Sequence, residues 1–370
     1  MKITSSLAKL FFTCTIYFCC VTIIFSQEKK TLLNGCLWLK GVEYKTENYT
    51  TPVNEEELAL RKYFNYNPCI DFSKDEILKK YKNLITKSSS LFVVFKSSSR
   101  EETILLSMER GSFKATLSNK KMLCDKDVIL NKGNSTSGII VSYLFNKNSL
   151  NGKKNGNLLF EDLLFEDTEF KNQLLELICI PKFINDKEKS IIESYLSLKY
   201  GISLNEGQSY YNSKGDKIWD VKENEGFNFN ITGIGKDDYL GLNQKQSKNS
   251  LQGGLSIGLK KVMKKNIENE TIIKDKEYLI WGDNGKNVVL EKNSDGTQKR
   301  MKRIWKIKPI SDSISKFTTQ LKIDKKLMPI EVKFDINDPE FIWLAVDNSN
   351  MSEFNYTDAK YIKATINNEN

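Results

Sequence analysis

The chain has 370 residues, 39% of them hydrophobic and 28% charged, which is enough for two folded domains of ordinary size. A mean hydropathy of −0.44 excludes a polytopic membrane protein. The formal net charge is +9, but the lysines are spread along the sequence rather than gathered in a block. We therefore expect a solvated lysine-rich surface and no nucleic-acid partner.

Histidine is absent from the whole sequence. This absence excludes Ser-His-Asp and Cys-His catalysis, histidine general bases and histidine metal ligands. An enzyme of this composition would have to use carboxylates, lysine, tyrosine or cysteine.

The start of the chain has the pattern of a signal peptide. Lys2 and Lys9 form a basic region, residues 10–25 are almost wholly apolar, and Ser26 precedes the polar run QEKK. An uncleaved anchor is the alternative, but the apolar run is short for a membrane span of about 20 residues. We therefore expect residues 1–26 to be a signal peptide, the protein to be secreted or held at the cell surface, and the mature chain to have no membrane span.

Four cysteines follow the signal: Cys36, Cys69, Cys124 and Cys179. In an exported domain they permit two disulfides with three possible connectivities. Their apolar, strand-like flanks suit buried thiols as well. No two of them have the short spacing of a metal site, so we expect no metal there, and the sequence leaves open both whether these cysteines form disulfides and how they would pair.

The region from 27 to 204 reads as a β-sandwich. Short runs rich in β-branched, aromatic and leucine residues are separated by Ser, Asn, Gly and Lys clusters, a pattern typical of that fold. The runs are 36–41, 64–72, 90–98, 103–108, 112–118, 138–145 and 174–180. Asn151 and Gly152 both tolerate positive φ and predict a hairpin turn.

Residues 158–167 read LLFEDLLFED, a tandem copy that brings several acids together. The repeat is either a cation or sugar site at the rim of the sandwich, or a duplication on a loop or edge strand.

A helix is predicted over residues 185–200. Asn185 is a good N-cap and Glu188 has the spacing of a capping box. Apolar residues then recur at helical spacing, and Gly201 can end the helix in a left-handed conformation. We expect this amphipathic helix to pack between two modules.

The region from 205 to 370 reads as antiparallel sheet. In residues 317–323 and 330–336, apolar and polar side chains alternate, so each strand has one dry and one wet face. The short connection between these two runs is typical of a hairpin.

The most distinctive stretch is GIGKDDYLGLNQKQSK, residues 233–248. It has neither helical nor strand periodicity, so we expect a structured loop. Gly233 and Gly235 lack the third glycine and the following helix of a dinucleotide-binding loop. Asp237, Asp238 and Asp283 are candidate calcium ligands, because oxygen ligands on glycine-flanked loops suit a hard cation.

The alternative for this stretch, which the sequence favours, is a hydrogen-bonded loop without a metal. Asp and Asn side chains can satisfy turn amides, and Gln244 and Gln246 can bridge neighbouring strands. In that case the stretch is a structural signature rather than a ligand site, and its residues are Gly233, Gly235, Asp237, Asp238, Asn243, Gln244 and Gln246.

This stretch resembles the signature GIGRDD-x-x-GLNQKQS of large secreted proteins of Bacteroidetes-type bacteria. There, an uncharacterised β-rich domain follows a LamG-like (concanavalin A-like) jelly roll. The run WGDN at 281–284 and the helix 185–200 also match that family, and residues 27–204 resemble the jelly roll more weakly. The resemblance implies an all-β fold of two β-sandwich or jelly-roll-like modules, 27–204 and 205–370, joined by one amphipathic helix. Compared with such relatives, the last strand is expected to be missing.

Export, two β-rich modules and the lack of a catalytic signature favour a non-catalytic surface module. It would be adhesin-like, or in contact with an extracellular glycan or another surface protein, with Trp219 as the expected exposed tryptophan. A jelly-roll polysaccharide hydrolase or lyase is one alternative, but the chain lacks the alternating carboxylates that retaining hydrolysis uses at about 5–5.5 Å. A purely structural spacer is the other, and sequence alone does not separate it from the first hypothesis.

Overall fold

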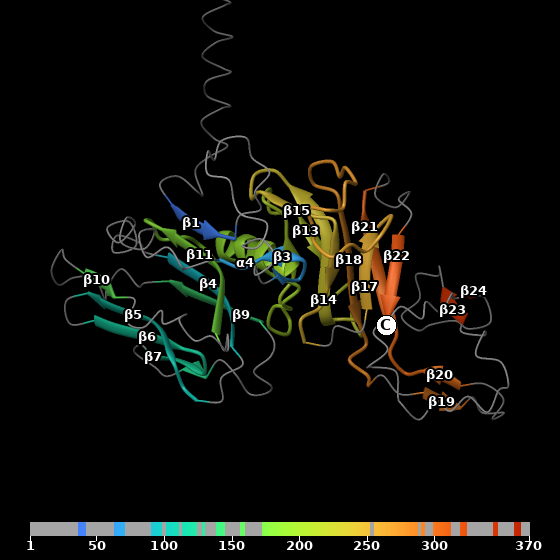
Figure 1. The fold of residues 1–370 in the computed structure, drawn as a ribbon, viewed down its shortest axis with the longest axis horizontal. Helices are drawn as coiled ribbons and strands as arrows, with labels where there is room; N and C mark the ends of the chain where they lie inside the picture. Colours follow the sequence, from blue (N-terminus) through green and yellow to red (C-terminus); the bar gives the residue numbers. More distant parts are fainter. Residues whose placement is uncertain are drawn as a thin grey trace, which may run out of the picture. The chain divides into compact units, whose positions relative to one another are not determined.

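The computed structural model describes residues 36–41, 63–70, 90–97, 101–110, 113–123, 128–129, 138–144, 156–159, 172–251, 255–287, 290–292, 299–311, 319–323, 343–346 and 359–363. These residues form several antiparallel sheets and one helix that lies between β-rich regions of the sequence (Figure 1). The prediction of a mostly β fold with one helix is confirmed at this level. Among the described residues, no helix is long and apolar enough to cross a membrane.

Several sequence-based predictions lie outside the described residues. They are the signal peptide 1–26, Cys124, the turn at Asn151 and Gly152, the acidic repeat beyond Leu159, and the strand 330–336.

The chain divides into two compact units. The first unit comprises residues 1–61 and 69–189, and the second comprises residues 62–68 and 190–370. The sequence predicts a boundary after residue 204, and this division differs from it in two ways. Most of the helix belongs to the second unit, and so does a short hairpin at residues 62–68, which the sequence predicts in the first module.

The first unit contains two antiparallel sheets (Figure 1). One has the order β1 (Leu37–Lys40), β11 (Asn172–Ile180), β4 (Ser90–Ser97) and β9 (Gly138–Leu144). The other has the order β10 (Gly156–Leu159), β5 (Ile104–Arg110), β6 (Phe113–Ser118), β7 (Lys121–Leu123) and β8 (Val128–Ile129). The central strands β4 and β11 are buried over most of their length, as their nearly continuous apolar sequences require.

Residues 64–72 do not form the single strand that their composition predicts. They turn back on themselves as β2 (Tyr63–Phe64) and β3 (Asn67–Pro68), which pair in an antiparallel hairpin. The turn residues Asn65 and Tyr66 have φ of 45° and 66°. Two successive positive φ values give a turn whose twist matches that of a β-hairpin.

The second unit is built on two sheets. One has the order β15 (Leu242–Gln244), β14 (Phe229–Asp237), β18 (Tyr278–Asp283) and β21 (Trp305–Ile310). The other has the order β16 (Gln246–Lys248), β17 (Leu255–Leu259) and β22 (Thr319–Ile323). Side chains from both sheets form one core: Ile234, Leu255, Ile257, Leu259, Ile273, Leu279 and Trp281, with Trp305 packed against them.

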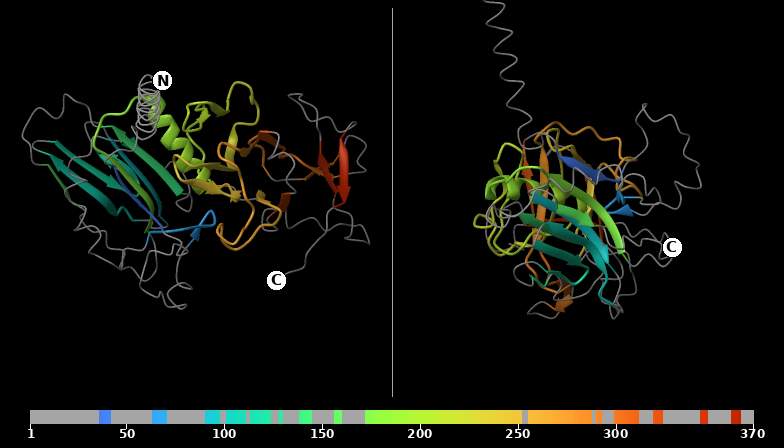
Figure 2. Two further views of the ribbon diagram at one scale, coloured as in Figure 1. Left: turned by 90° about the horizontal axis from the view of Figure 1, so that it is seen from above. Right: turned by 90° about the vertical axis from the view of Figure 1, so that its left-hand side faces the viewer.

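Three further two-stranded sheets complete the described structure. They are β12 (Tyr210–Tyr211) with β13 (Lys217–Trp219), β19 (Leu290–Lys292) with β20 (Lys299–Met301), and β23 (Trp343–Val346) with β24 (Lys360–Lys363). The left-hand view of Figure 2 shows the pair β23 and β24 in red.

The stretch 233–248 is mostly strand, not the loop that we expected. It provides the end of β14, a turn, and then β15 and β16. Its first two glycines lie within β14 at positions where a side chain would not fit. A Cβ on Gly233 would lie 2.9 Å from Leu279 O and 3.1 Å from Leu198 Cδ2, and a Cβ on Gly235 would overlap the ring of Tyr278. These glycines therefore make room for neighbouring side chains rather than for a turn.

The helix α4 (Asp186–Tyr200) begins and ends as its sequence predicts. Asn185 Oδ1 accepts a hydrogen bond of 2.9 Å from Glu188 N, and Glu188 Oε2 accepts one of 2.9 Å from Asn185 N, which is a capping box. At the other end Gly201 has φ of 62°, and Ile202 N donates to Ser197 O at 3.1 Å. This pattern is a Schellman motif.

Candidate functional site

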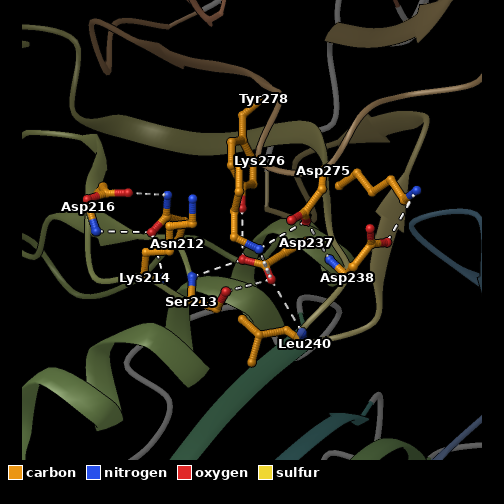
Figure 3. A network of polar contacts seen from close by, with 11 residues as sticks. Asn212, Ser213, Lys214, Asp216, Asp237, Asp238, Leu240, Asp275, Lys276 and Tyr278 are labelled. Atoms are coloured by element: carbon orange, nitrogen blue, oxygen red, sulfur yellow. Dashed lines mark hydrogen bonds and ion pairs between the residues drawn. The ribbon is translucent and has the colours of Figure 1, made fainter. Parts of the chain in front are cut away.

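The carboxylate of Asp237, at the end of β14, is the centre of the polar network in Figure 3. The residue is 1% exposed. Its oxygens accept hydrogen bonds from Ser213 N at 2.9 Å, Ser213 Oγ at 2.8 Å, Leu240 N at 3.3 Å, Lys276 Nζ at 2.7 Å and Tyr278 OH at 3.0 Å. A carboxylate offers about four lone-pair sites, so these donors saturate it.

Ser213 reaches Asp237 because the turn between β12 and β13 is itself held by side chains. Asn212 Oδ1 accepts from Lys214 N at 2.9 Å and from Asp216 N at 3.0 Å. Asn212 Nδ2 donates to Asp216 Oδ2 at 2.9 Å. The Asn side chain thus replaces a backbone turn partner and fixes the position of Ser213.

Tyr278 reaches Asp237 from the neighbouring strand. It lies opposite Gly235 in the register of β14 and β18, and its ring occupies the space that a side chain at Gly235 would fill. Burial, together with the negative charge of Asp237, raises the pKa of Tyr278 well above its usual range. The phenol therefore stays protonated and serves as a donor to the carboxylate.

Lys276 joins Asp237 to the surface. Its Nζ is 2.7 Å from Asp237 Oδ1 and 3.0 Å from Asp275 Oδ1. Asp275 also accepts a hydrogen bond of 2.8 Å from Asp238 N. The side chain of Asp238 is 61% exposed and pairs with Lys236 at 3.2 Å, so the two adjacent acids have different surroundings.

The three predicted calcium ligands do not share one site. Asp237 and Tyr278 lie at one end of β18, and Asp283 lies at the other end. Along the strand, Tyr278 and Asp283 are about 16 Å apart, at a rise of about 3.3 Å per residue. Asp283 is 1% exposed and accepts bonds of 2.8 Å from Asn230 Nδ2 and 2.8 Å from Gly285 N. The calcium hypothesis is therefore corrected, because the carboxylates are separated and two of them are occupied by protein donors.

The Gln residues of the signature bridge strands and loops, as the alternative hypothesis predicted. Gln246 Nε2 donates to Met263 O at 3.0 Å, and its Oε1 accepts from Met263 N at 2.7 Å. Gln244 Nε2 donates to Gln246 O at 2.7 Å. At Asn243 the backbone carbonyl group takes part, because it accepts a hydrogen bond of 2.7 Å from Asn266 Nδ2.

Trp219 is not the exposed tryptophan that the sequence suggested. It is 0% exposed, and its Nε1 donates to Asn228 Oδ1 at 3.0 Å. Because the indole N–H has an internal partner, the ring can be buried without an unsatisfied donor. The residue therefore offers no stacking surface to a sugar.

The remaining chemistry-bearing groups of the described chain form no metal site. Within the described residues, no group of three or more acidic or cysteine side chains is arranged to hold a metal ion. Cys36, Cys69 and Cys179 are thiols there, and burial raises the pKa of Cys179.

Sequence reasoning missed the partners of the signature, which are Ser213, Lys276, Tyr278, Asn65 and Asn67. Only the last two had a readable signal. Asn65 and Asn67 flank a tyrosine just before Pro68, and such Asn and Pro clusters mark turns rather than strands.

Comparison with known proteins finds a family match for the second half of the chain. Residues 188–370 match a family model described as a domain of unknown function, DUF8202. This domain begins inside α4 and includes the whole network around Asp237, but not the hairpin 62–68 that belongs to the same compact unit. No curated protein and no solved structure matches the chain.

Proposed function

We propose that this protein is a non-catalytic module of an exported cell-surface protein, with an adhesin-like role in contact with an extracellular glycan or another surface protein. It would be built from two β-sandwich-like modules, the first a LamG-like jelly roll. The signal-peptide pattern of residues 1–26 supports export, and the strand order of residues 36–180 supports the jelly roll.

One observation carries the non-catalytic part of the proposal. The polar side chains of Asp237, Gln244 and Gln246 in the stretch 233–248 make their hydrogen bonds within the protein. Asp237 is saturated by five donors, and Gln244 and Gln246 are 1% and 0% exposed. A carboxylate or amide in that state stabilises the fold and has no free capacity for a substrate.

The same geometry disfavours the hydrolase alternative. Among the described residues, Asp237 and Asp275 are two carboxylates that both pair with the ammonium group of Lys276. Retaining hydrolysis needs two carboxylates about 5–5.5 Å apart that both reach the scissile bond. Asp237 is 1% exposed, so a polysaccharide does not reach it.

The proposal is tested with the purified chain from residue 27 onward on an array of glycans and on an array of extracellular surface proteins, with and without calcium. We expect saturable binding to one glycan class or to an extracellular surface protein, with no change on adding a chelator. A parallel assay for new reducing ends on a polysaccharide panel should show no turnover. Turnover would contradict the proposal, and a folded protein that binds no glycan and no surface protein would favour the structural spacer.

Specific binding by loops can be separated from loss of fold. Ile272 is 82% exposed beside Ile273, which is 1% exposed and part of the core. Ile272→Ser therefore changes the surface alone, whereas Ile273→Ser damages the core. A binding defect in the first variant with unchanged unfolding would place the contact surface on the DUF8202 domain.

A further inference from the structure

The tip of the hairpin β2–β3 is held by the DUF8202 domain through side-chain amides. Asn65 Nδ2 donates to Lys199 O at 3.0 Å and to Ser247 Oγ at 2.9 Å. Asn65 Oδ1 accepts from Lys248 N at 2.8 Å. Asn65 is 5% exposed, so every polar atom of this amide needs an internal partner and has one.

Asn67 makes the second set of contacts. Its Nδ2 donates to Lys199 O at 2.7 Å and to Gln244 Oε1 at 3.0 Å. In return, Gln244 Nε2 donates to Asn65 O at 3.1 Å, and Asn266 N donates to Tyr66 O at 2.9 Å. The domain therefore forms hydrogen bonds with both the backbone and the side chains of the tip.

The receiving surface is shaped for this tip. The carbonyl group of Lys199 lies in the last turn of α4, where carbonyl groups lack helical partners, and both Asn amides fill that need. Gly201 allows the end of α4 to lie against Lys248 and the hairpin together, since a Cβ there would overlap Lys248 O and would lie 3.1 Å from Asn65 Nδ2. Gln244 and Ser247 are 1% and 0% exposed, so their polar atoms depend on internal partners such as the hairpin.

The hairpin itself adopts a conformation that it would not hold well alone. Tyr66 is a bulky residue with φ of 66°, a left-handed conformation that side chains other than Gly and Asn rarely adopt. Lysine side chains cover its two tyrosines, with Lys248 Nζ 5.7 Å from the ring of Tyr66 and Lys265 Nζ 5.2 Å from that of Tyr63. Contacts from the domain thus maintain the strained turn.

We propose that the end of α4, the strands 244–248 and Asn266 form a peptide-binding site for an Asn-x-Asn β-hairpin tip. Residues 63–68 are its resident ligand in this chain. The hairpin lies outside residues 188–370, which match DUF8202, so the domain depends on a segment that precedes it. When its own hairpin is removed, the site takes a hairpin of the same sequence from solution.

The test compares the wild-type chain with the double variant Asn65→Ala/Asn67→Ala. This variant keeps the hairpin but removes the two side-chain amides that bind to the site. The probe is a synthetic peptide of residues 61–70 carrying Cys69→Ser. We expect the variant to lose about 5 °C or more in Tm, and the peptide to bind it saturably and restore part of that loss. The wild-type chain should bind no peptide, because its own hairpin is present at a far higher effective concentration.

Two controls make the result specific. A peptide in which both Asn residues are replaced by Ala should neither bind nor restore Tm. The variant Asn212→Ala damages the network around Asp237 instead, and the wild-type peptide should leave its Tm unchanged. If the double variant does not fold, the peptide is added during refolding, and recovery of cooperative unfolding is the expected result.

The proposal is overturned if the double variant keeps the wild-type Tm. It is also overturned if the peptide neither binds the double variant nor restores its Tm or folding. The assay involves no glycan and no surface protein, so its outcome is independent of the proposed function.

Discussion

Tyr278 OH donates a hydrogen bond of 3.0 Å to Asp237 Oδ2, and the ring of Tyr278 fills the space above Gly235 on the neighbouring strand. Two positions of the signature therefore depend on one tyrosine, because the glycine makes room for the ring and the aspartate accepts a hydrogen bond from its hydroxyl group. This arrangement links β14 to β18 at the point where the chain turns after Asp237. The signature is in this sense a packing and hydrogen-bonding device.

Tyr278→Phe tests the value of that bond while it keeps the ring over Gly235. The variant removes one donor from a buried carboxylate, and hydrogen bonds to charged groups contribute about 1.5–3 kcal/mol. We expect a loss of that size in the unfolding free energy, measured by urea denaturation at pH 7. A loss below about 0.5 kcal/mol would contradict the structural role of the hydroxyl group.

Alkaline pH should weaken the fold through the same residue. The folded-state pKa of Tyr278 is raised, first by burial and then by the charge of Asp237, above the unfolded value of about 10. Below pH 10 both states keep the proton, and above it only the unfolded state loses it. Stability should therefore fall by about 1.4 kcal/mol per pH unit above pH 10 for this residue.

The matched control for the pH dependence is Tyr278→Phe. This variant lacks the titrating hydroxyl group, so the slope of its unfolding free energy against pH should be smaller by the contribution of one proton. Tyr210, whose pKa burial raises to about 12, adds a second contribution between pH 10 and pH 12 that this variant keeps. Equal slopes in the variant and the wild-type protein between pH 9 and pH 11 would show that Tyr278 ionises normally in the fold.

Gly235→Ala should be more damaging than its small size suggests. The added methyl group would overlap the buried ring of Tyr278, and overpacking of this kind costs about 1–3 kcal/mol. Gly207→Ala is the control, because a Cβ there meets nothing within 4 Å and only its φ of 83° opposes the change. Urea unfolding should therefore rank Gly235→Ala as the less stable variant, and the reverse order would contradict the packing at Gly235.

Calcium should have no effect on the stability of the DUF8202 domain. Asp237 and Asp283 are occupied by protein donors at opposite ends of β18. Differential scanning fluorimetry with millimolar calcium and with a chelator should give the same Tm within about 1 °C. A larger calcium-dependent rise would show that one of these carboxylates gives up its internal partners for the ion.

Local sequence signals predicted the regular elements well. The capping box of Asn185 and Glu188, together with Gly201, located α4 to within one residue. The apolar runs around β4 and β11 became strands because burial of such runs dominates the local choice. These features depend on neighbours in the sequence, which is why they can be read directly from it.

Contacts between distant residues were not predictable in the same way. The bond from Asn67 to Gln244 joins residues 177 positions apart, and that from Tyr278 to Asp237 joins residues 41 apart. Composition shows that an amide or a carboxylate needs partners when it is buried, but not which partners it finds. The sequence therefore indicated a hydrogen-bonded segment at 233–248, whereas its donors and the hairpin 63–68 required the fold.

The two adjacent acids of the signature give the most direct test of whether it holds the fold or forms a site. Asp237 is 1% exposed, whereas the side chain of Asp238 is 61% exposed. Asp237→Ala removes the acceptor of the Ser213 amide and of the Tyr278 hydroxyl group, and it leaves Lys276 with Asp275 as its carboxylate partner, so urea unfolding should show a loss of about 3–5 kcal/mol. Asp238→Ala should stay within about 0.5 kcal/mol of wild type. A folded Asp237→Ala variant of wild-type stability would contradict the account, and the signature would then have to be a binding or catalytic site.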